Sequence, residues 1–267
     1  MDQTYSTITL DATRAGIAVV SLNRPEKHNA FNADVISELS DVFDVLKGQD
    51  GIRMVIIRGA GKSFSAGADL EWMKAAADYT RDENEEDAVA LAAMLRRLYE
   101  LPQLTLALVQ GAAMGGGAGL VAACDVAIAL AGTKFRFSEV RLGLTPATIS
   151  PFVIEAIGPS WARALFATGE MFDAAYAEKI GLVHYTAANT EELVQLEEHI
   201  ASLVFAAAPG AINDSKALVR DMKGKEINSH LGHETAKRIA ARRASDEGRE
   251  GLSAFLEKRK PNWAEDA

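Results

Sequence analysis

The segment Gly111-Ala-Ala-Met-Gly-Gly-Gly-Ala-Gly119 has the composition of a turn whose backbone, rather than its side chains, meets a ligand. Consecutive glycines are costly inside a helix or strand, because glycine loses the most backbone freedom on ordering. A second small-residue turn, Phe64-Ser-Ala-Gly-Ala-Asp-Leu70, follows the apolar run that begins at Met54. Each turn comes after a short buried strand, so the two could direct two free N–H groups at one oxygen. That arrangement is an oxyanion hole, which stabilises negative charge on a carbonyl oxygen.

Glu139 is the carboxylate that could act beside such donors. The segment Lys134-Phe-Arg-Phe-Ser-Glu139 alternates, and a strand would put Phe135, Phe137 and Glu139 on one face. If a glutamate in line with two phenylalanines is buried, it is desolvated, which raises its pKa and suits general acid–base catalysis. The pattern alone fits equally a strand-end glutamate that reaches solvent or pairs with Arg141.

Strands and helices alternate around these turns. Continuous apolar runs predict strands at 17–22, 54–57, 104–109 and 126–130. Periodicity predicts a helix between Asn32, as its N-cap, and Gly48, with further helices at 88–99 and 118–124. The acidic residues 82–87 are expected to form a solvated loop or a helix start. Such alternation implies right-handed crossovers and an α/β fold with a largely parallel sheet.

Beyond about residue 147 the pattern becomes helical. Helices are predicted at 160–168, 174–180 and 191–208, with two more to the C-terminus, of which the last covers 251–260. The chain is therefore expected to consist of an α/β core and a helical C-terminal third.

The composition is that of an ordinary globular chain of 267 residues, 48% hydrophobic and 24% charged. This length suits one large domain, or a domain with an appendage. The net charge of −9 argues against nucleic acid or an anionic membrane as the main partner. A single cysteine, Cys124, excludes a disulfide framework, no apolar run approaches membrane-spanning length, and Met1-Asp-Gln-Thr lacks a secretion signal. A cytoplasmic protein is the expectation.

Several familiar motifs fail on spacing. Gly61-Lys-Ser63 would need a glycine at Ile56 to be a P-loop, and the glycine run would need one at Leu120 to be a dinucleotide fingerprint. Ser65 does not lie in a Gly-x-Ser-x-Gly elbow. The five histidines show neither HExxH spacing nor cysteine partners, so no metal site is predicted.

Taken together, these segments resemble the crotonase (enoyl-CoA hydratase/isomerase) superfamily. The matching pieces keep their order and spacing over essentially the full chain: Leu22–Ala30, Phe64–Leu70, Gln110–Gly119, Cys124-Asp125, Phe137–Gly143, Gly181–His184 and 248–261. The resemblance implies a spiral of ββα turns in residues 1–200 that binds an acyl-CoA thioester. It implies a helical oligomerisation region in residues 201–267, homotrimers or dimers of trimers, and no cofactor other than the coenzyme A of the substrate.

Residue by residue, the resemblance assigns the oxyanion-hole amides to Ala68 and Gly116, and proton transfer to Glu139. It makes Lys27 a cationic contact to the CoA phosphates, where an ordinary turn lysine is the alternative. It also implies a strip along the adenine and pantetheine, formed by Ala30, Ala66, Asp69 and Leu70. Phe255 and Lys258, at the last helix, would reach CoA from a neighbouring region or subunit.

The sequence departs from the two-glutamate hydratases at Gly119, where the second glutamate would stand. We expect the vacated space to hold a second water or a substrate carboxylate. Segments 114–125 and 138–151 resemble methylglutaconyl-CoA hydratases of leucine breakdown and related isoprenoid-acid degraders. The expected reaction is hydration of an α,β-unsaturated CoA thioester, in which Glu139 takes a proton from water and delivers one to Cα. A Δ3,Δ2-enoyl-CoA isomerase, a non-catalytic CoA-ester-binding protein and thioester hydrolysis are the alternatives.

Overall fold

The structure is a computed structural model that describes residues 4–264, so the first three residues of the segment considered for a secretion signal lie outside it. Its strands are β1 (Ile8–Asp11), β2 (Ile17–Leu22), β3 (Met54–Gly59), β4 (Leu104–Val109), β5 (Ala112–Met114), β6 (Val126–Leu130), β7 (Lys134–Arg136), β8 (Met171–Asp173) and β9 (Tyr185–Ala187). Its α-helices are α1 (Ala33–Lys47), α2 (Leu70–Ala76), α3 (Arg81–Tyr99), α4 (Gly116–Ala122), α5 (Ser150–Thr168), α6 (Ala174–Ile180), α7 (Thr190–Ala206), α8 (Pro209–Met222), α9 (Ser229–Ala244) and α10 (Asp246–Glu257). Short 3-10 helices are η1 (Pro25–Lys27), η2 (Glu139–Leu142) and η3 (Asn262–Ala264).

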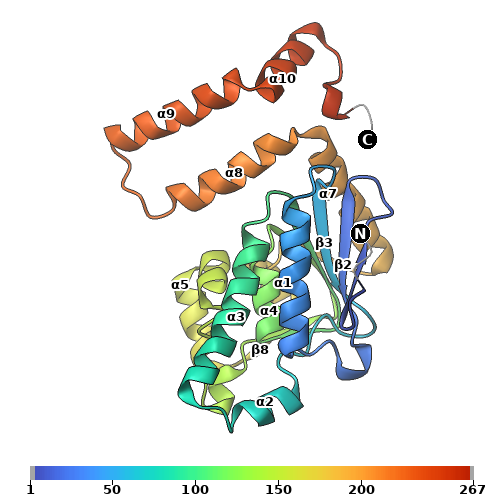
Figure 1. Cartoon of the computed structure of the whole chain (residues 1–267), viewed down its shortest axis with the longest axis vertical. Coiled ribbons are helices and arrows are strands. Elements are labelled where there is room, and N and C mark those ends of the chain that lie inside the picture. The colour runs from blue at the N-terminus through green and yellow to red at the C-terminus, as the bar shows by residue number, and fades with distance from the viewer. Residues whose placement is uncertain (1–3, 265–267) are drawn as a thin grey trace.

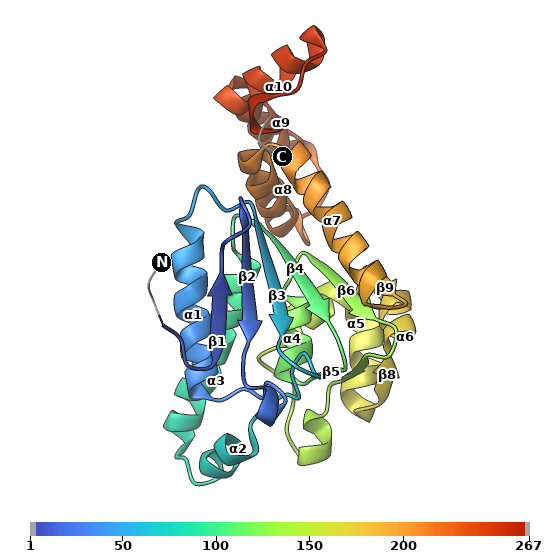
Figure 2. The same cartoon turned by 90° about the vertical axis from the view of Figure 1, so that its right-hand side faces the viewer.

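The larger sheet has the strand order β1-β2-β3-β4-β6-β9. Only the β1–β2 pair is antiparallel, so the predicted α/β fold with a largely parallel sheet is confirmed. Parallel pairing puts the carboxyl ends of β2, β3, β4 and β6 at one edge. The smaller sheet, β5-β7-β8, lies just beyond that edge, because β5 begins three residues after β4 ends (Figure 2).

Two apolar layers enclose the larger sheet. Alternate residues of β3 show the division: Val55 and Ile57 join the core formed with α1, α3, α4 and α5, whereas Met54 and Ile56 join the core formed with α7. A strand buried on both faces needs apolar residues throughout, which is why these strands appear as continuous apolar runs in the sequence. Figure 1 shows α1 and α3 side by side over one face, with α7 behind the sheet.

The predicted strands at 17–22, 104–109 and 126–130 and the helix 174–180 are confirmed with their bounds. Asn32 and Gly48 do cap α1, and the Asn32 side chain accepts from the amide of Val35. The acidic residues 82–87 start α3, where Thr80 and Glu83 form a capping box.

Other predicted bounds were wrong. Helix α4 begins at Gly116 rather than at 118, and α5 begins at Ser150 rather than at 160. The break in α5 at Gly158, with φ 74° just before Pro159, hides its first turns from a periodicity argument. Within residues 4–264, three α-helices rather than two follow α7, and the last of them begins at Asp246. The expected division between residues 200 and 201 falls inside α7 and stays a prediction.

Helices α8, α9 and α10 form an arm that extends from the core (Figure 1). Lys216 of α8 attaches this arm to the sheet, because its buried ammonium lies 2.6 Å from Asp125 and donates to the carbonyls of Leu101 and Gln103 at 2.7 Å. The same Asp125 oxygen accepts from the amide and hydroxyl of Thr105. A buried ammonium with three acceptors is satisfied, so the arm has a defined orientation.

None of the helices in the described range 4–264 has the length and apolar character needed to cross a membrane.

Candidate active site

The two small-residue turns lie side by side beyond the carboxyl ends of β3 and β4. Ser65 and Ala113 form a parallel bridge. The amide of Ser65 donates to the Ala112 carbonyl at 2.9 Å, and the amide of Met114 donates to the Ser65 carbonyl at 3.0 Å. The convergence of the turns that the sequence predicted is therefore confirmed.

Phe31 holds the ends of both turns. It forms a parallel bridge with Ala68, but its hydrogen bonds go to the residues on either side. The amide of Phe31 donates to the Gly67 carbonyl at 2.7 Å, and the amide of Asp69 donates to the Phe31 carbonyl at 2.8 Å. This pattern directs the N–H of Ala68 away from Phe31. The Phe31 ring packs on Gly116, where an added Cβ would lie 3.3 Å from the ring.

The amides of Ala68 and Gly116 are two free donors. Gly116 is the first residue of α4, where N–H groups have no acceptor within the helix, and the first helical bond runs from Gly119 to Gly115. In the part of the chain that the structure describes, neither amide donates a hydrogen bond. Free amides beside a helix N-terminus are suited to an oxygen that gains negative charge.

Glu139 lies next to these donors. A Cβ built on Gly115, the residue before Gly116, would lie 3.2 Å from the Glu139 Oε1 atom. The other oxygen, Oε2, is buried and has no hydrogen-bond partner among residues 4–264. Burial raises the pKa of Glu139, which is the first of the two alternatives that the sequence pattern left open.

The backbone that carries Glu139 differs from the expected strand. Strand β7 ends at Arg136, and Glu139 begins the 3-10 helix η2. The alternation correctly places Phe135 and Phe137 in the core, but Ser138 leaves the extended conformation with φ −89° and ψ −7°. Glu139 is thus desolvated by the turn in which it lies, not by sharing a strand face with two phenylalanines.

The space that Gly119 was expected to leave for a water or a substrate carboxylate is filled. A Cβ built on Gly119 would lie 2.3 Å from Cγ2 of Ile149 and 2.7 Å from its Cβ. Ile149 is 1% exposed and precedes α5. The expectation of an open space was wrong, because a side chain from a later loop occupies it.

We expect Gly119→Ala to lower the free energy of unfolding by about 1–3 kcal/mol, the usual cost of forcing an extra carbon into a packed core. Urea unfolding measures this loss. Gly132→Ala is the matched control, because nothing lies within 4 Å of its built Cβ. Equal stabilities for the two variants would contradict the close packing of Ile149 on Gly119.

The residues predicted to bind CoA by the resemblance lie around the Ala68 turn. Ala66, Leu70 and Lys27 are exposed. The Lys27 ammonium lies 3.5 Å from a carboxylate oxygen of Glu71. Ala30 is buried, and its carbonyl accepts from Arg24. These residues form one surface next to the free amides.

Asp69, also predicted to bind CoA, has a side chain with a structural task. It is 4% exposed, lies 2.8 Å from the Arg24 guanidinium, and accepts from the amide of Glu71 to cap α2. Burial alone would raise the pKa of Asp69, but the hydrogen bonds from Glu71 and Arg24 outweigh it and the pKa is lowered. The backbone of Asp69 is also hydrogen-bonded, because its amide donates to the Phe31 carbonyl and its carbonyl accepts from the amide of Met73.

Arg24 and Asn29 support the site, but the sequence did not indicate what their side chains do. Arg24 joins Ala30 and Asp69 through one guanidinium. Asn29 is 1% exposed, donates to the carbonyls of Ala60 and Ser63, and accepts from the amide of Arg24. The φ of Asn29 is 55°, so it lies in a strained turn. A polar residue shortly after a strand gives no sign in the sequence that it will be buried.

Phe255 and Lys258 are not brought to this surface within the chain. Both are exposed at the C-terminal end of α10, and the two views place α10 and α2 at opposite ends of the molecule (Figures 1 and 2). If they contact CoA, they do so in another copy of the chain.

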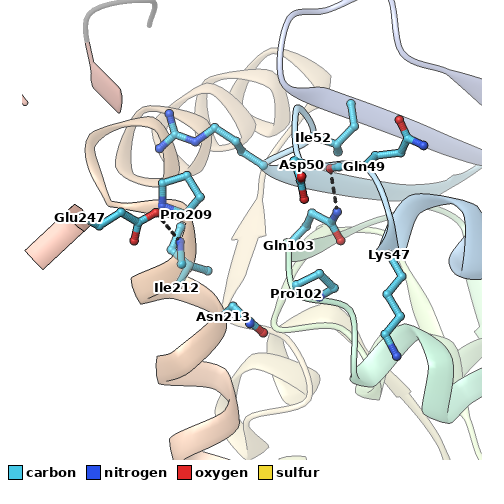
Figure 3. A pocket seen from close by; sticks show the side chains of 12 residues that line it. Lys47, Gln49, Asp50, Ile52, Pro102, Gln103, Pro209, Ile212, Asn213 and Glu247 are labelled. Carbon is cyan, nitrogen blue, oxygen red and sulfur yellow. Dashed lines mark hydrogen bonds between the residues drawn. The ribbon is translucent and has the colours of Figure 1, made fainter. Parts of the chain in front are cut away.

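A cavity of about 400 Å³ lies elsewhere, between the core and the start of α8 (Figure 3). Ile52 and Gln103, which line it, precede β3 and β4, so the cavity is at the amino ends of these strands. The free amides and Glu139 are at the opposite edge. Because ligands of parallel sheets bind beyond the carboxyl ends of the strands, the Ala68–Gly116 edge is the candidate active site.

No cluster of three or more metal-ligating side chains is found among residues 4–264. Three of the histidines have partners of their own: His28 Nδ1 lies 3.4 Å from the Ser63 hydroxyl, His184 Nδ1 accepts from the amide of Ala127, and His233 Nδ1 lies 2.8 Å from the Ser229 carbonyl.

The fold and the site place two free main-chain amides beside a desolvated carboxylate, an arrangement suited to a carbonyl oxygen that gains negative charge. The model of the enoyl-CoA hydratase/isomerase family matches residues 12–266. The crotonyl-CoA hydratase of Syntrophomonas wolfei is 32% identical over 92% of this chain and 94% of its own length. The crystal structure of an enoyl-CoA hydratase from Shewanella pealeana, 37% identical, superposes with a TM-score of 0.94 over 98% of this chain and 97% of that one. The chain belongs to the enoyl-CoA hydratase/isomerase family.

Proposed function

We propose that this protein adds water across the double bond of an α,β-unsaturated acyl-CoA thioester. The observation that supports this most is the pair of free amides, Ala68 and Gly116, next to the desolvated carboxylate of Glu139. In the proposed reaction Glu139 takes a proton from water as the water oxygen bonds to Cβ. The electron pair of the double bond moves to the thioester oxygen, which the two amides stabilise. The protonated Glu139 then delivers its proton to Cα, which regenerates both the carbonyl and the carboxylate.

The acyl group that we propose is of the methylglutaconyl type, from leucine or isoprenoid-acid degradation. Its support is the resemblance of segments 114–125 and 138–151 to hydratases of such esters. In this proposal CoA lies along Lys27, Ala30, Ala66, Asp69 and Leu70, and no metal or further cofactor takes part.

We also propose a cytoplasmic homotrimer or dimer of trimers, in which Phe255 and Lys258 of one copy reach the CoA of another. Its support is the exposure of apolar side chains on the arm: Leu218, Val219, Ile239, Leu252, Phe255 and Leu256. Contiguous exposed apolar surface commonly marks an interface.

A panel of enoyl-CoA esters, including one with a distal carboxylate, tests the reaction and the acyl group together. Hydration appears as a mass gain of about 18 Da and a loss of absorbance at the enoyl-thioester band. The carboxylated ester is expected to give the highest kcat/KM. If it is among the poorest substrates, the methylglutaconyl assignment fails. If every ester binds and none is converted, the protein is a CoA-ester-binding protein instead.

A Δ3,Δ2-enoyl-CoA isomerase is the second candidate, and the filled space at Gly119 favours it. Isomerisation needs only one base, which moves a proton from Cα to Cγ or back, and needs no water. A rise in absorbance at the enoyl-thioester band from a 3-enoyl-CoA substrate, without a mass change, would identify this reaction.

A further inference from the structure

We propose that Ile149 sets the balance between hydration and isomerisation, by occupying the position from which a second polar group would reach the substrate. This inference rests on the proposed function and concerns the same site. It assigns Ile149 a positioning role, since its side chain acts on what can lie beside Glu139.

The geometry starts from Gly115, which caps α4, and Gly119, which lies inside the helix. Gly119 follows Gly115 by four residues, and its amide donates to the Gly115 carbonyl at 3.0 Å. Glu139 lies over Gly115, with Oε1 3.2 Å from a built Cβ, and Ile149 lies over Gly119. Glu139 and Ile149 therefore pack over the two glycines, Gly115 and Gly119, that lie on either side of the Gly116 amide along the chain.

Ile149 leaves no room for a water at its own position. It is 1% exposed and belongs to the apolar core that includes Ala118 and Val153. A water needs both space and two to four polar partners, and an isoleucine in a packed core offers neither. Ile149 therefore offers neither space nor a polar partner to a water that attacks Cβ.

This arrangement limits hydration more than isomerisation. Hydration needs a positioned water as well as a proton carrier, whereas isomerisation needs only the carrier. A larger, more polar space at residue 149 is expected to admit a second water and to favour hydration. A glycine at 119 without Ile149 above it would not limit hydration, so the two residues act as one unit.

The experiment compares Ile149→Ser, which opens the space and supplies a hydroxyl, with Ile149→Val, which keeps Cγ2 and an apolar surface. Each is given a 2-enoyl-CoA and the matching 3-enoyl-CoA, and the rate ratio of hydration to isomerisation is measured. Ile149→Ser is expected to raise this ratio about tenfold or more. A change of one or two methylenes in an apolar pocket commonly has an effect of at least this size. Ile149→Val is expected to leave the ratio unchanged.

Ile200→Ser controls for general loss of packing, because Ile200 is buried in α7 on the other face of the sheet. It should lower stability without changing the ratio. If Ile149→Ser does not fold, Ile149→Thr is compared with Ile149→Val instead. Threonine and valine have nearly the same shape, so this pair differs mainly in the hydroxyl group. An unchanged ratio in the folded polar variant overturns the role of Ile149 and leaves the proposed function standing. A wild-type protein that converts neither ester overturns the proposed function, and this inference with it.

Discussion

Glu139→Gln is expected to lower kcat by about 10²–10⁴-fold, the usual contribution of a positioned general acid–base group. Glutamine keeps the shape of the side chain but can neither accept a proton from water nor deliver one to Cα. The amides of Ala68 and Gly116 are main chain and stay in place, so binding of CoA esters should persist. Steady-state kinetics together with calorimetric titration of a saturated acyl-CoA measures both quantities.

The stability of the Glu139→Gln variant separates a catalytic role from a structural one. Because burial raises the pKa of Glu139, the folded protein binds this proton more tightly than the unfolded chain does. The stabilising contribution of this group is therefore complete below the ordinary glutamate pKa and is lost as the pH rises through the raised value. At pH 8 the variant should be at least as stable as the wild type in urea unfolding. A variant that is unstable at pH 8, or that retains turnover, would contradict the role of Glu139.

Gly115→Ala is expected to lower kcat by about 10²–10³-fold, the range observed when one oxyanion-hole donor is lost. Gly115 has φ 49° and ψ −117°, a conformation that residues with a Cβ rarely adopt. The added methyl would also meet Glu139 Oε1 at 3.2 Å. Relief of this strain moves the Gly116 amide and the carboxylate together, so transition-state stabilisation should fall more than ester binding.

Gly224→Ala is the matched control for Gly115→Ala. Gly224 also has a positive φ, 70°, but nothing lies within 4 Å of its built Cβ. It should show a similar loss of stability in urea unfolding and an unchanged kcat. If Gly115→Ala keeps the kcat of the wild type, the turn at 114–116 does not position a donor for the reaction.

The sequence predicts best what is determined locally. The strands at 17–22, 104–109 and 126–130 are continuous apolar runs, and the caps of α1 are set by Asn32 and Gly48 themselves. The convergence of the two small-residue turns follows because both come after neighbouring parallel strands. The alternation left the burial of Glu139 open, and a turn rather than a strand produces it.

Contacts between distant segments could not be predicted in this way. Ile149 lies 30 residues after Gly119, and nothing in either segment indicates that one side chain fills the place of the other. Arg24 and Asp69 are 45 residues apart, and each is a common surface residue until the fold buries the pair. Helix α5 was predicted only in part, because Gly158 and Pro159 interrupt its pattern while the structure continues past them.

The attachment of α8 through Lys216 has a consequence for any shortened form of this protein. A chain that stops after α7 would remove the only lysine paired with Asp125 in the described residues and would leave that carboxylate without its cation between β4 and β6. An unpaired, largely covered charge destabilises the segment around it. Residues 124–130 link α4, with its free amide, to the sheet, so the damage would reach the catalytic edge. A truncated enzyme would therefore need an uncharged residue at position 125 before it could serve as a minimal catalyst.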